Sequence, residues 1–160
     1  MKASSSAKRS MVVQETVRFL LMSAVFMVVV SIASADQAGT YVGSAECSAC
    51  HEGITKSWEK TGHARAFQSL KKTSQENLAG CQLCHVTAFD EPGGFVDQEL
   101  TPELMNVQCE ECHGPGKLHS TDPSKKGSIL GKVPEAKCRK CHTPGQDKNF
   151  NYSKKIKLIH

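Results

Sequence analysis

Every cysteine of this chain belongs to one five-residue pattern, Cys-x-x-Cys-His, which occurs four times in 160 residues. In sequence order, the four motifs are Cys47, Cys50 and His51; Cys81, Cys84 and His85; Cys109, Cys112 and His113; and Cys138, Cys141 and His142. This spacing is the attachment signature of c-type haem, in which two thiols form thioethers with the porphyrin and the adjoining histidine ligates the iron. The sequence therefore predicts four covalently bound haem c groups and a redox function.

Paired cysteines also occur in zinc sites, in disulfide scaffolds and in thioredoxin-like redox motifs. Neither a zinc site nor a disulfide scaffold explains a histidine directly after every second cysteine, as this chain has. A thioredoxin-like motif would occur once, near a β-α-β pattern, and no such pattern is visible. Haem attachment is therefore favoured, and a non-redox zinc or scaffold protein is the remaining alternative.

The N-terminal segment has the features of an export signal. Basic residues come first, a 15-residue apolar run extends from Phe19 to Ala33, and Ala33-Ser34-Ala35 resembles a cleavage site. The run is shorter than the ~18 apolar residues that indicate a membrane span, so cleavage after Ala35 is favoured over retention as an anchor. We expect residues 1–35 to be a signal peptide and the mature protein to be periplasmic, with an extracellular location as the alternative.

Residues 36–160 are long enough for a single tetrahaem cytochrome c domain. The whole chain has 20 Lys+Arg and 16 Asp+Glu, of which four basic residues and one acidic residue lie in residues 1–35, so the remainder carries a net charge of +1. Eight haem propionates, less one positive charge per ferric iron, bring the loaded protein to about −3. This balance does not indicate a nucleic-acid partner.

The mature segment is poor in apolar side chains, with one Trp, two Tyr and four Phe. Because such a chain cannot build an ordinary core unaided, we expect folding to be coupled to haem loading. The expected fold class is mainly α with extensive loops, a small multihaem cytochrome c fold wrapped around four covalent haems, with little regular sheet.

The strongest helix prediction covers residues 54–72, where His63, Ala66, Phe67 and Leu70 fall on one apolar face. A second helix is expected to start at Thr101 and run to the third motif. An extended lead-in is expected at residues 36–46, and Gly80 is expected to end the first helical region. Turns are expected at residues 91–94 and 114–116, and a surface loop at residues 122–132.

The chain has seven histidines, four of them in the motifs, which leaves His63, His119 and His160 as candidate second ligands of the irons. Four irons with two histidine ligands each would need eight. One iron must therefore differ: it is five-coordinate, or it takes another ligand such as Met105, the one methionine after residue 35.

Several longer segments resemble the tetrahaem cytochrome c-554 family. They are Tyr41-x-Gly43 before the first motif; Trp58-x-x-x-Gly62-His63-Ala64-x-Ala66 with Leu70; Gly93-Gly94-Phe95 after the second motif; and Cys109-Glu110-x-Cys112-His113-Gly114-Pro115-Gly116. The resemblance implies a mainly helical fold with haems in closely stacked pairs. It also implies iron ligation by His51 with His119, His113 with His63, and His142 with His160, and an open, five-coordinate haem at His85.

Members of that family pass electrons from a hydroxylamine-oxidising enzyme towards quinone-linked carriers, and their open haem has been linked to nitric oxide reduction. This chain is shorter between the third and fourth motifs and lacks the family's longer lysine-containing tail, so the resemblance does not identify its partners.

Three functions follow from these patterns. The leading one is an exported electron carrier that relays electrons between redox proteins or quinone-linked carriers, with no membrane span after signal cleavage. The second is a small reductase of nitric oxide, nitrite or hydroxylamine at the His85 haem, where no catalytic side chain is assigned. The third is a quinol dehydrogenase anchored by a retained N-terminal helix. The sequence predicts no oligomeric state.

Overall fold

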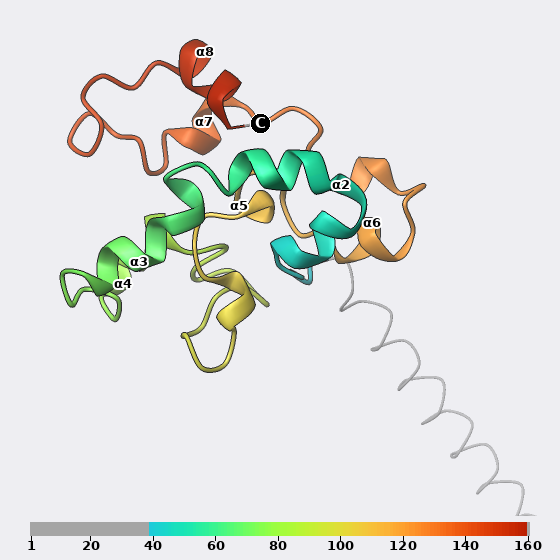
Figure 1. Cartoon of the computed structure of the whole chain (residues 1–160), viewed down its shortest axis with the longest axis horizontal. Coiled ribbons are helices and arrows are strands. Elements are labelled where there is room, and N and C mark those ends of the chain that lie inside the picture. The colour runs from blue at the N-terminus through green and yellow to red at the C-terminus, as the bar shows by residue number, and fades with distance from the viewer. Residues whose placement is uncertain (1–38, 160) are drawn as a thin grey trace, which may run out of the picture. The chain divides into compact units, whose positions relative to one another are not determined.

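Short helices joined by loops make up residues 39–159, the part of the chain that this computed structural model describes (Figure 1). The helices are α2 (Ser44–Trp58), α3 (Ala66–Lys71), α4 (Ala79–His85), α5 (Cys109–His113), α6 (Lys117–Thr121), α7 (Glu135–Cys138) and α8 (Tyr152–Lys155). Four single 3-10 turns cover His63–Arg65, Pro102–Leu104, Lys126–Ser128 and Ile156–Leu158. Within the described residues, β pairing is limited to one isolated bridge between Val86 and Met105. The expectation of a mainly α fold with extensive loops is confirmed.

Each of the four Cys-x-x-Cys-His motifs lies within a helix or at the end of one. The first three motifs lie inside α2, α4 and α5, and the fourth starts at the end of α7 and continues into a turn. In an α-helix, residues i, i+3 and i+4 share one face, so the motif's own spacing brings both thiols and the imidazole to the same side. Helical structure at the second and third motifs therefore suits this arrangement, whereas His51 of the first motif has non-helical backbone angles and the fourth motif leaves the helix at Cys138.

The expected continuous helix over residues 54–72 is wrong. Helix α2 begins earlier, at Ser44, and ends at Trp58, and the chain turns before His63 begins the 3-10 turn that leads into α3. The buried indole of Trp58 lies at the break, and its Nε1 donates to the carbonyl oxygen of Val107, 2.9 Å away. The early start of α2 also corrects the extended lead-in, which ends at Gly43 with a φ of 82°.

The expected helix from Thr101 to the third motif is also wrong. Only one 3-10 turn forms there, and the chain then runs extended so that Met105 pairs with Val86. Asn106 has a φ of 72°, which a continuous helix does not allow. Gly80 lies inside α4 rather than ending a helical region.

The expected turn at residues 91–94 and the surface loop are confirmed, whereas residues 114–116 form an irregular link without an assigned turn. In the turn at residues 91–94, the N–H of Gly94 donates to the carbonyl oxygen of Glu91 at 2.9 Å. Gly114, with a φ of 86°, separates α5 from α6. Residues 122–132 are mostly exposed and contain a single 3-10 turn.

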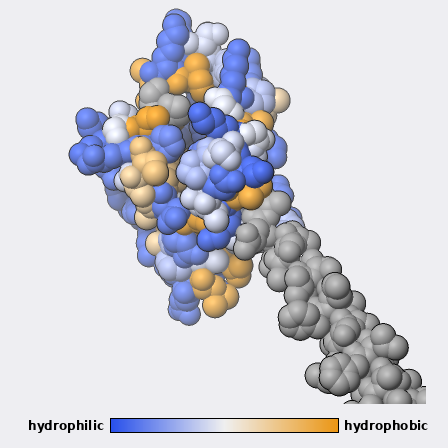
Figure 2. All heavy atoms as spheres, turned by 90° about the vertical axis from the view of Figure 1, so that its right-hand side faces the viewer, coloured by the Kyte–Doolittle hydropathy of each residue, from blue (hydrophilic) through white to orange (hydrophobic). Residues whose placement is uncertain are grey.

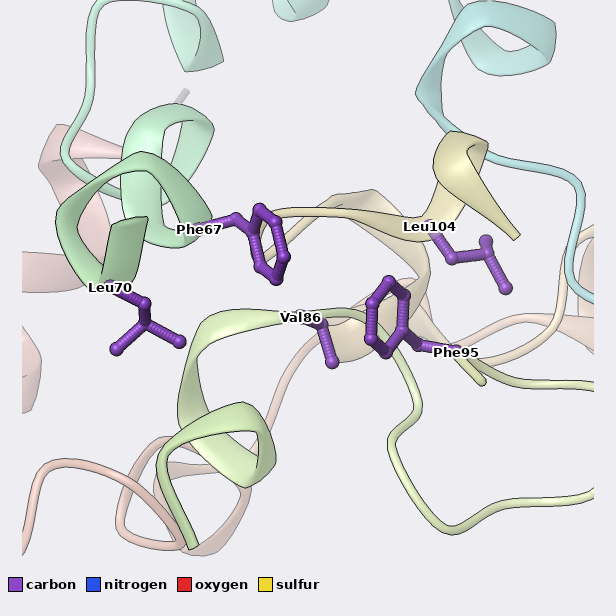
Figure 3. Close-up of a cluster of buried hydrophobic side chains, with 5 residues drawn as sticks. All are labelled: Phe67, Leu70, Val86, Phe95 and Leu104. Carbon is purple, nitrogen blue, oxygen red and sulfur yellow. The ribbon is translucent and has the colours of Figure 1, made fainter. Parts of the chain in front are cut away.

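A small hydrophobic cluster joins α3, the segment after α4 and the 3-10 turn before the third motif (Figure 3). Its buried members are Phe67, Leu70, Val86, Phe95 and Leu104. The partly buried Tyr41, Cys81, Phe89 and Met105 pack against it. The cluster is small for a chain of this length, which agrees with the expectation that the polypeptide alone supplies little core.

Several large apolar side chains lie outside this cluster, and Figure 2 shows apolar patches between hydrophilic ones on one face. Leu83, between the two cysteines of the second motif, is 54% exposed. None of the helices within residues 39–159 is long and apolar enough to cross a membrane. The predicted signal peptide and His160 lie outside the described residues.

Candidate haem sites

Three of the motif histidines have an oxygen atom beside Nδ1 of the ring, and this contact sets the orientation of the imidazole. Nδ1 of each lies within hydrogen-bonding distance of an oxygen acceptor: His85 with the Ala66 carbonyl at 2.8 Å, His113 with the Leu130 carbonyl at 2.5 Å, and His142 with the Asp147 carboxylate at 3.0 Å. With the proton on Nδ1, Nε2 is left as the basic nitrogen that can bind a metal. The three rings therefore fit the proximal ligand position of a c-type haem.

Two of the spare histidines face motif histidines. The ring centroids of His119 and His51 lie 6.4 Å apart, and those of His63 and His142 lie 5.9 Å apart. For comparison, the ring of Phe150 stacks on His142 at 4.5 Å. The two histidine pairs are thus spaced more widely than the stacked pair, and this spacing suits two imidazoles that bind one iron from opposite sides.

The environment of His63 favours neutral imidazole, the form that ligates metals. Burial, and then the charge of His142, lower the pKa of His63 below its ordinary value. Nδ1 of His119 is buried and has no hydrogen-bond partner in the described structure. A buried imidazole nitrogen left unpaired in this way is a fitting metal ligand.

The facing pairs agree only in part with those that the family resemblance implies. His51 with His119 is the implied pair. His63, however, faces His142, whereas the resemblance implies His113 as its partner. The His63 carbonyl accepts from Val107 N–H at 3.2 Å, which holds the turn beside the segment before α5. The ligand assignments themselves stay predictions.

All eight motif cysteines are free thiols, and the thiols of different motifs lie close together. The Cys47 thiol hydrogen-bonds that of Cys109, and this bond, followed by burial, raises the pKa of Cys47. The first and third motifs are therefore neighbours, in line with the contact between α2 and α5.

The fourth motif lies near the second, where the Cys141 thiol donates to the Leu83 carbonyl oxygen at 3.7 Å, and near the third. Burial raises the pKa of Cys141, and a hydrogen bond to the Cys84 thiol raises it further. Burial and the charge of Cys138 raise the pKa of Cys112 to about 11. The attachment thiols thus form a continuous series in which the first motif neighbours the third, the third neighbours the fourth, and the fourth neighbours the second.

The carboxylate of Glu110, between the cysteines of the third motif, is buried and fully engaged with backbone N–H groups. It accepts hydrogen bonds from Gly43 and Gly116, both at 2.7 Å, and from Val42 at 3.0 and 3.1 Å. Sequence reasoning quoted Glu110 within the family pattern but assigned it no role. Its position four residues before Gly114-Pro115-Gly116 was the available signal, since this segment brings the Gly116 N–H to the carboxylate.

The surroundings of His85 differ from those of the other motif histidines. Its Nδ1 lies 2.8 Å from the Ala66 carbonyl and 3.2 Å from the Ser69 hydroxyl. The two spare histidines of the described residues face other motifs. Met105, the alternative sixth ligand, packs its side chain against the hydrophobic cluster.

Residues 46–114 match the family described as "Cytochrome c554 and c-prime". Cytochrome c-554 of Nitrosomonas europaea (strain ATCC 19718) is 33% identical over 107 residues, which cover 58% of this chain and 46% of that protein. The chain thus spans less than half the length of this curated relative.

A solved structure, the reduced state of cytochrome c554 from Nitrosomonas europaea, matches 76% of this chain and 83% of its own chain. The TM-score is 0.62 and the sequence identity 25%. Members of this family carry four covalently bound haem c groups, and the eight cysteines of this chain fit the four attachment motifs. Residues 46–114 are thus similar to the cytochrome c-554 family, and the described chain shares the fold of the solved cytochrome c554.

Proposed function

We propose that the chain is an exported electron carrier that relays electrons between redox partner proteins. The observation that carries this proposal is the closeness of the motifs: α2 contacts α5, and the Cys141 thiol donates to the carbonyl oxygen of Leu83, inside the second motif, at 3.7 Å. Bound haem supplies one-electron redox chemistry. Because each motif neighbours another, the chain holds its four attachment points in one connected group, as a relay requires.

The proposed ligands are the motif histidines and the spare histidines that face them. His51 pairs with His119, and His142 pairs with His63, as the ring separations of 6.4 and 5.9 Å support. These pairs leave His160 as the candidate second ligand for the iron of His85 or of His113. Because the family resemblance implies an open haem at His85, His160 is the proposed partner of His113. In this proposal His63 ligates the iron of the fourth motif, whereas the family resemblance implies the iron of the third.

An electron paramagnetic resonance spectrum of the oxidised holoprotein tests this assignment. We expect three low-spin irons and one high-spin iron. The variants H63A and H119A should each convert one further iron to high spin. Four low-spin irons in the unaltered protein would contradict the open site at His85.

The relay itself is tested by mixing the fully reduced protein with a small oxidised c-type cytochrome. We expect four electrons to be delivered per chain, as followed by stopped-flow absorbance. Delivery of fewer than four, with four haems present by pyridine haemochrome assay, would contradict a relay that includes all four motifs.

A reductase of nitric oxide, nitrite or hydroxylamine at the His85 haem is the second candidate. His63 and His119 face the histidines of other motifs, so neither of them faces His85 as a second iron ligand. This observation favours the reductase. Turnover of one of these substrates by the reduced protein would support it. Turnover that persists when His85 haem is blocked by cyanide would contradict it.

Export is part of the proposal and rests on the N-terminal residues 1–35. N-terminal sequencing of the mature protein provides the test. A start at Asp36 supports a periplasmic or extracellular carrier, and a retained N-terminus supports a membrane-anchored quinol dehydrogenase.

A further inference from the structure

The fourth motif differs from the second and third in the group that faces Nδ1 of its histidine. Backbone carbonyl oxygens fill this position at the second and third motifs. At His142 the partner is a carboxylate, since Oδ2 of Asp147 lies 3.0 Å from Nδ1. A charged acceptor makes a stronger hydrogen bond than a neutral one.

A tight turn fixes the carboxylate at this position. The carbonyl oxygen of Thr143 accepts from the N–H groups of Gln146 at 3.0 Å and Asp147 at 2.8 Å, which returns the chain towards His142. The ring of Phe150 stacks on His142 with a centroid distance of 4.5 Å and an interplanar angle of 18°. The turn sets the position of the acceptor, and the stacked ring sets the orientation of the imidazole.

The neighbouring cation, Arg139, donates from Nη1 to the backbone carbonyl oxygen of His142 at 3.5 Å. The guanidinium of Arg139 pairs with the Glu135 carboxylate at 2.9 Å and lies over the face of Phe150 at 4.7 Å. The side chains of His142 and Asp147 are only 32% and 30% exposed. The charge of Asp147 is therefore directed at His142, in a partly buried setting where electrostatic interactions are less screened than in water.

We propose that Asp147 is a positioning residue for the haem of the fourth motif and lowers the reduction potential of that haem. The carboxylate accepts a hydrogen bond from Nδ1–H of His142. This bond would hold Nε2 towards the iron and make it a stronger donor, which stabilises the oxidised state of the haem. The inference rests on the proposed ligation of iron by His142, and it does not depend on which protein exchanges electrons with the chain.

The test is a spectroelectrochemical titration of the four-haem protein and of its D147N variant. Asparagine keeps an oxygen acceptor at nearly the same place and removes the charge. We expect one of the four one-electron couples to become at least tenfold easier to reduce, a rise of about 59 mV, while the other three move much less. The matched control is D122N, which removes an exposed aspartate bonded to Ser124.

An unchanged set of couples in D147N, or an equal shift in D122N, would overturn the proposal. If D147N matures with fewer than four haems, D147S is titrated in its place, because serine offers a neutral acceptor without an amide group. A wild-type protein that does not take up four electrons reversibly would contradict the proposed carrier function. A reversible four-electron wild type with no shift in the variant would contradict only the role of Asp147.

Discussion

The buried carboxylate of Glu110 accepts a hydrogen bond from the backbone N–H of Gly43, 2.7 Å away, and so ties the segment before the first motif to the third motif. Two further backbone N–H groups point at the same carboxylate. In E110Q, an amide NH₂ would meet some of these donors and leave buried groups unsatisfied. We expect a loss of about 1–3 kcal/mol in the free energy of unfolding, measured by guanidinium denaturation of the holoprotein.

The control for this prediction is E99Q. Glu99 is exposed, and its replacement should change the free energy of unfolding by less than about 0.5 kcal/mol. Equal stability of E110Q and E99Q would mean that the Glu110 carboxylate does not hold the two segments together.

Gly94 provides a second prediction, because it has no room for a side chain. A Cβ at this position would lie 1.8 Å from the carbonyl oxygen of Ala88, a backbone atom that cannot rotate away. We expect G94A to lower the free energy of unfolding by about 3 kcal/mol, at the upper end of overpacking costs. The measurement is thermal or denaturant unfolding.

Gly53 is the matched control. It lies inside α2, and nothing lies within 4 Å of a Cβ built there. Alanine is the better helix former, so G53A should raise the free energy of unfolding by about 0.5–1 kcal/mol. A similar loss in both variants would indicate a general effect of alanine rather than the close approach at Gly94.

The local part of this fold was predictable from the sequence, and the long-range part was not. The spacing of each motif is itself helical, so the helices around the motifs follow from local rules. The apolar spacing from His63 to Leu70 also looks helical, but it belongs to a separate turn and helix. At the break before His63, Trp58 bonds the carbonyl of Val107, a contact between distant segments that no local pattern contains.

The candidate haem sites were likewise predictable in their local part only. Cysteines and proximal histidines follow from the motif, and the count of spare histidines predicts that one iron differs. His63 faces His142 because two segments that are far apart in the sequence lie side by side in the fold. The sequence alone could not predict this pair. Asp147 was missed because an acidic residue five positions after a motif is not a known signal, and its role emerges only from the turn that brings it back.

Met105 gives a third prediction, which concerns the sixth ligand of the His85 haem. The Met105 side chain packs against the hydrophobic cluster. A leucine of similar volume should therefore be tolerated at a cost below about 1.5 kcal/mol. We expect the paramagnetic resonance spectrum of M105L to keep the same number of high-spin irons as the unaltered protein.

H119A is the positive control for that experiment, because it removes a proposed ligand and should add one high-spin iron. If M105L adds a high-spin iron as well, Met105 is a ligand and the His85 site is closed in the unaltered protein.

Tyr41 provides the last prediction, on the pH dependence of stability. Burial raises the pKa of its phenol above the ordinary 10.0, and the negative charges of Glu91, Glu111 and Glu110 add to this effect. The unfolded chain therefore loses the phenolic proton at a lower pH than the folded chain. The stabilisation from Tyr41 is complete below about pH 10 and is lost as the pH rises towards the folded-state pKa. The free energy of unfolding should fall more steeply above pH 10 in the unaltered protein than in Y41F, as measured by denaturant titrations from pH 8 to pH 11. Parallel curves for the two proteins across this range would show that the phenol does not ionise later in the folded state.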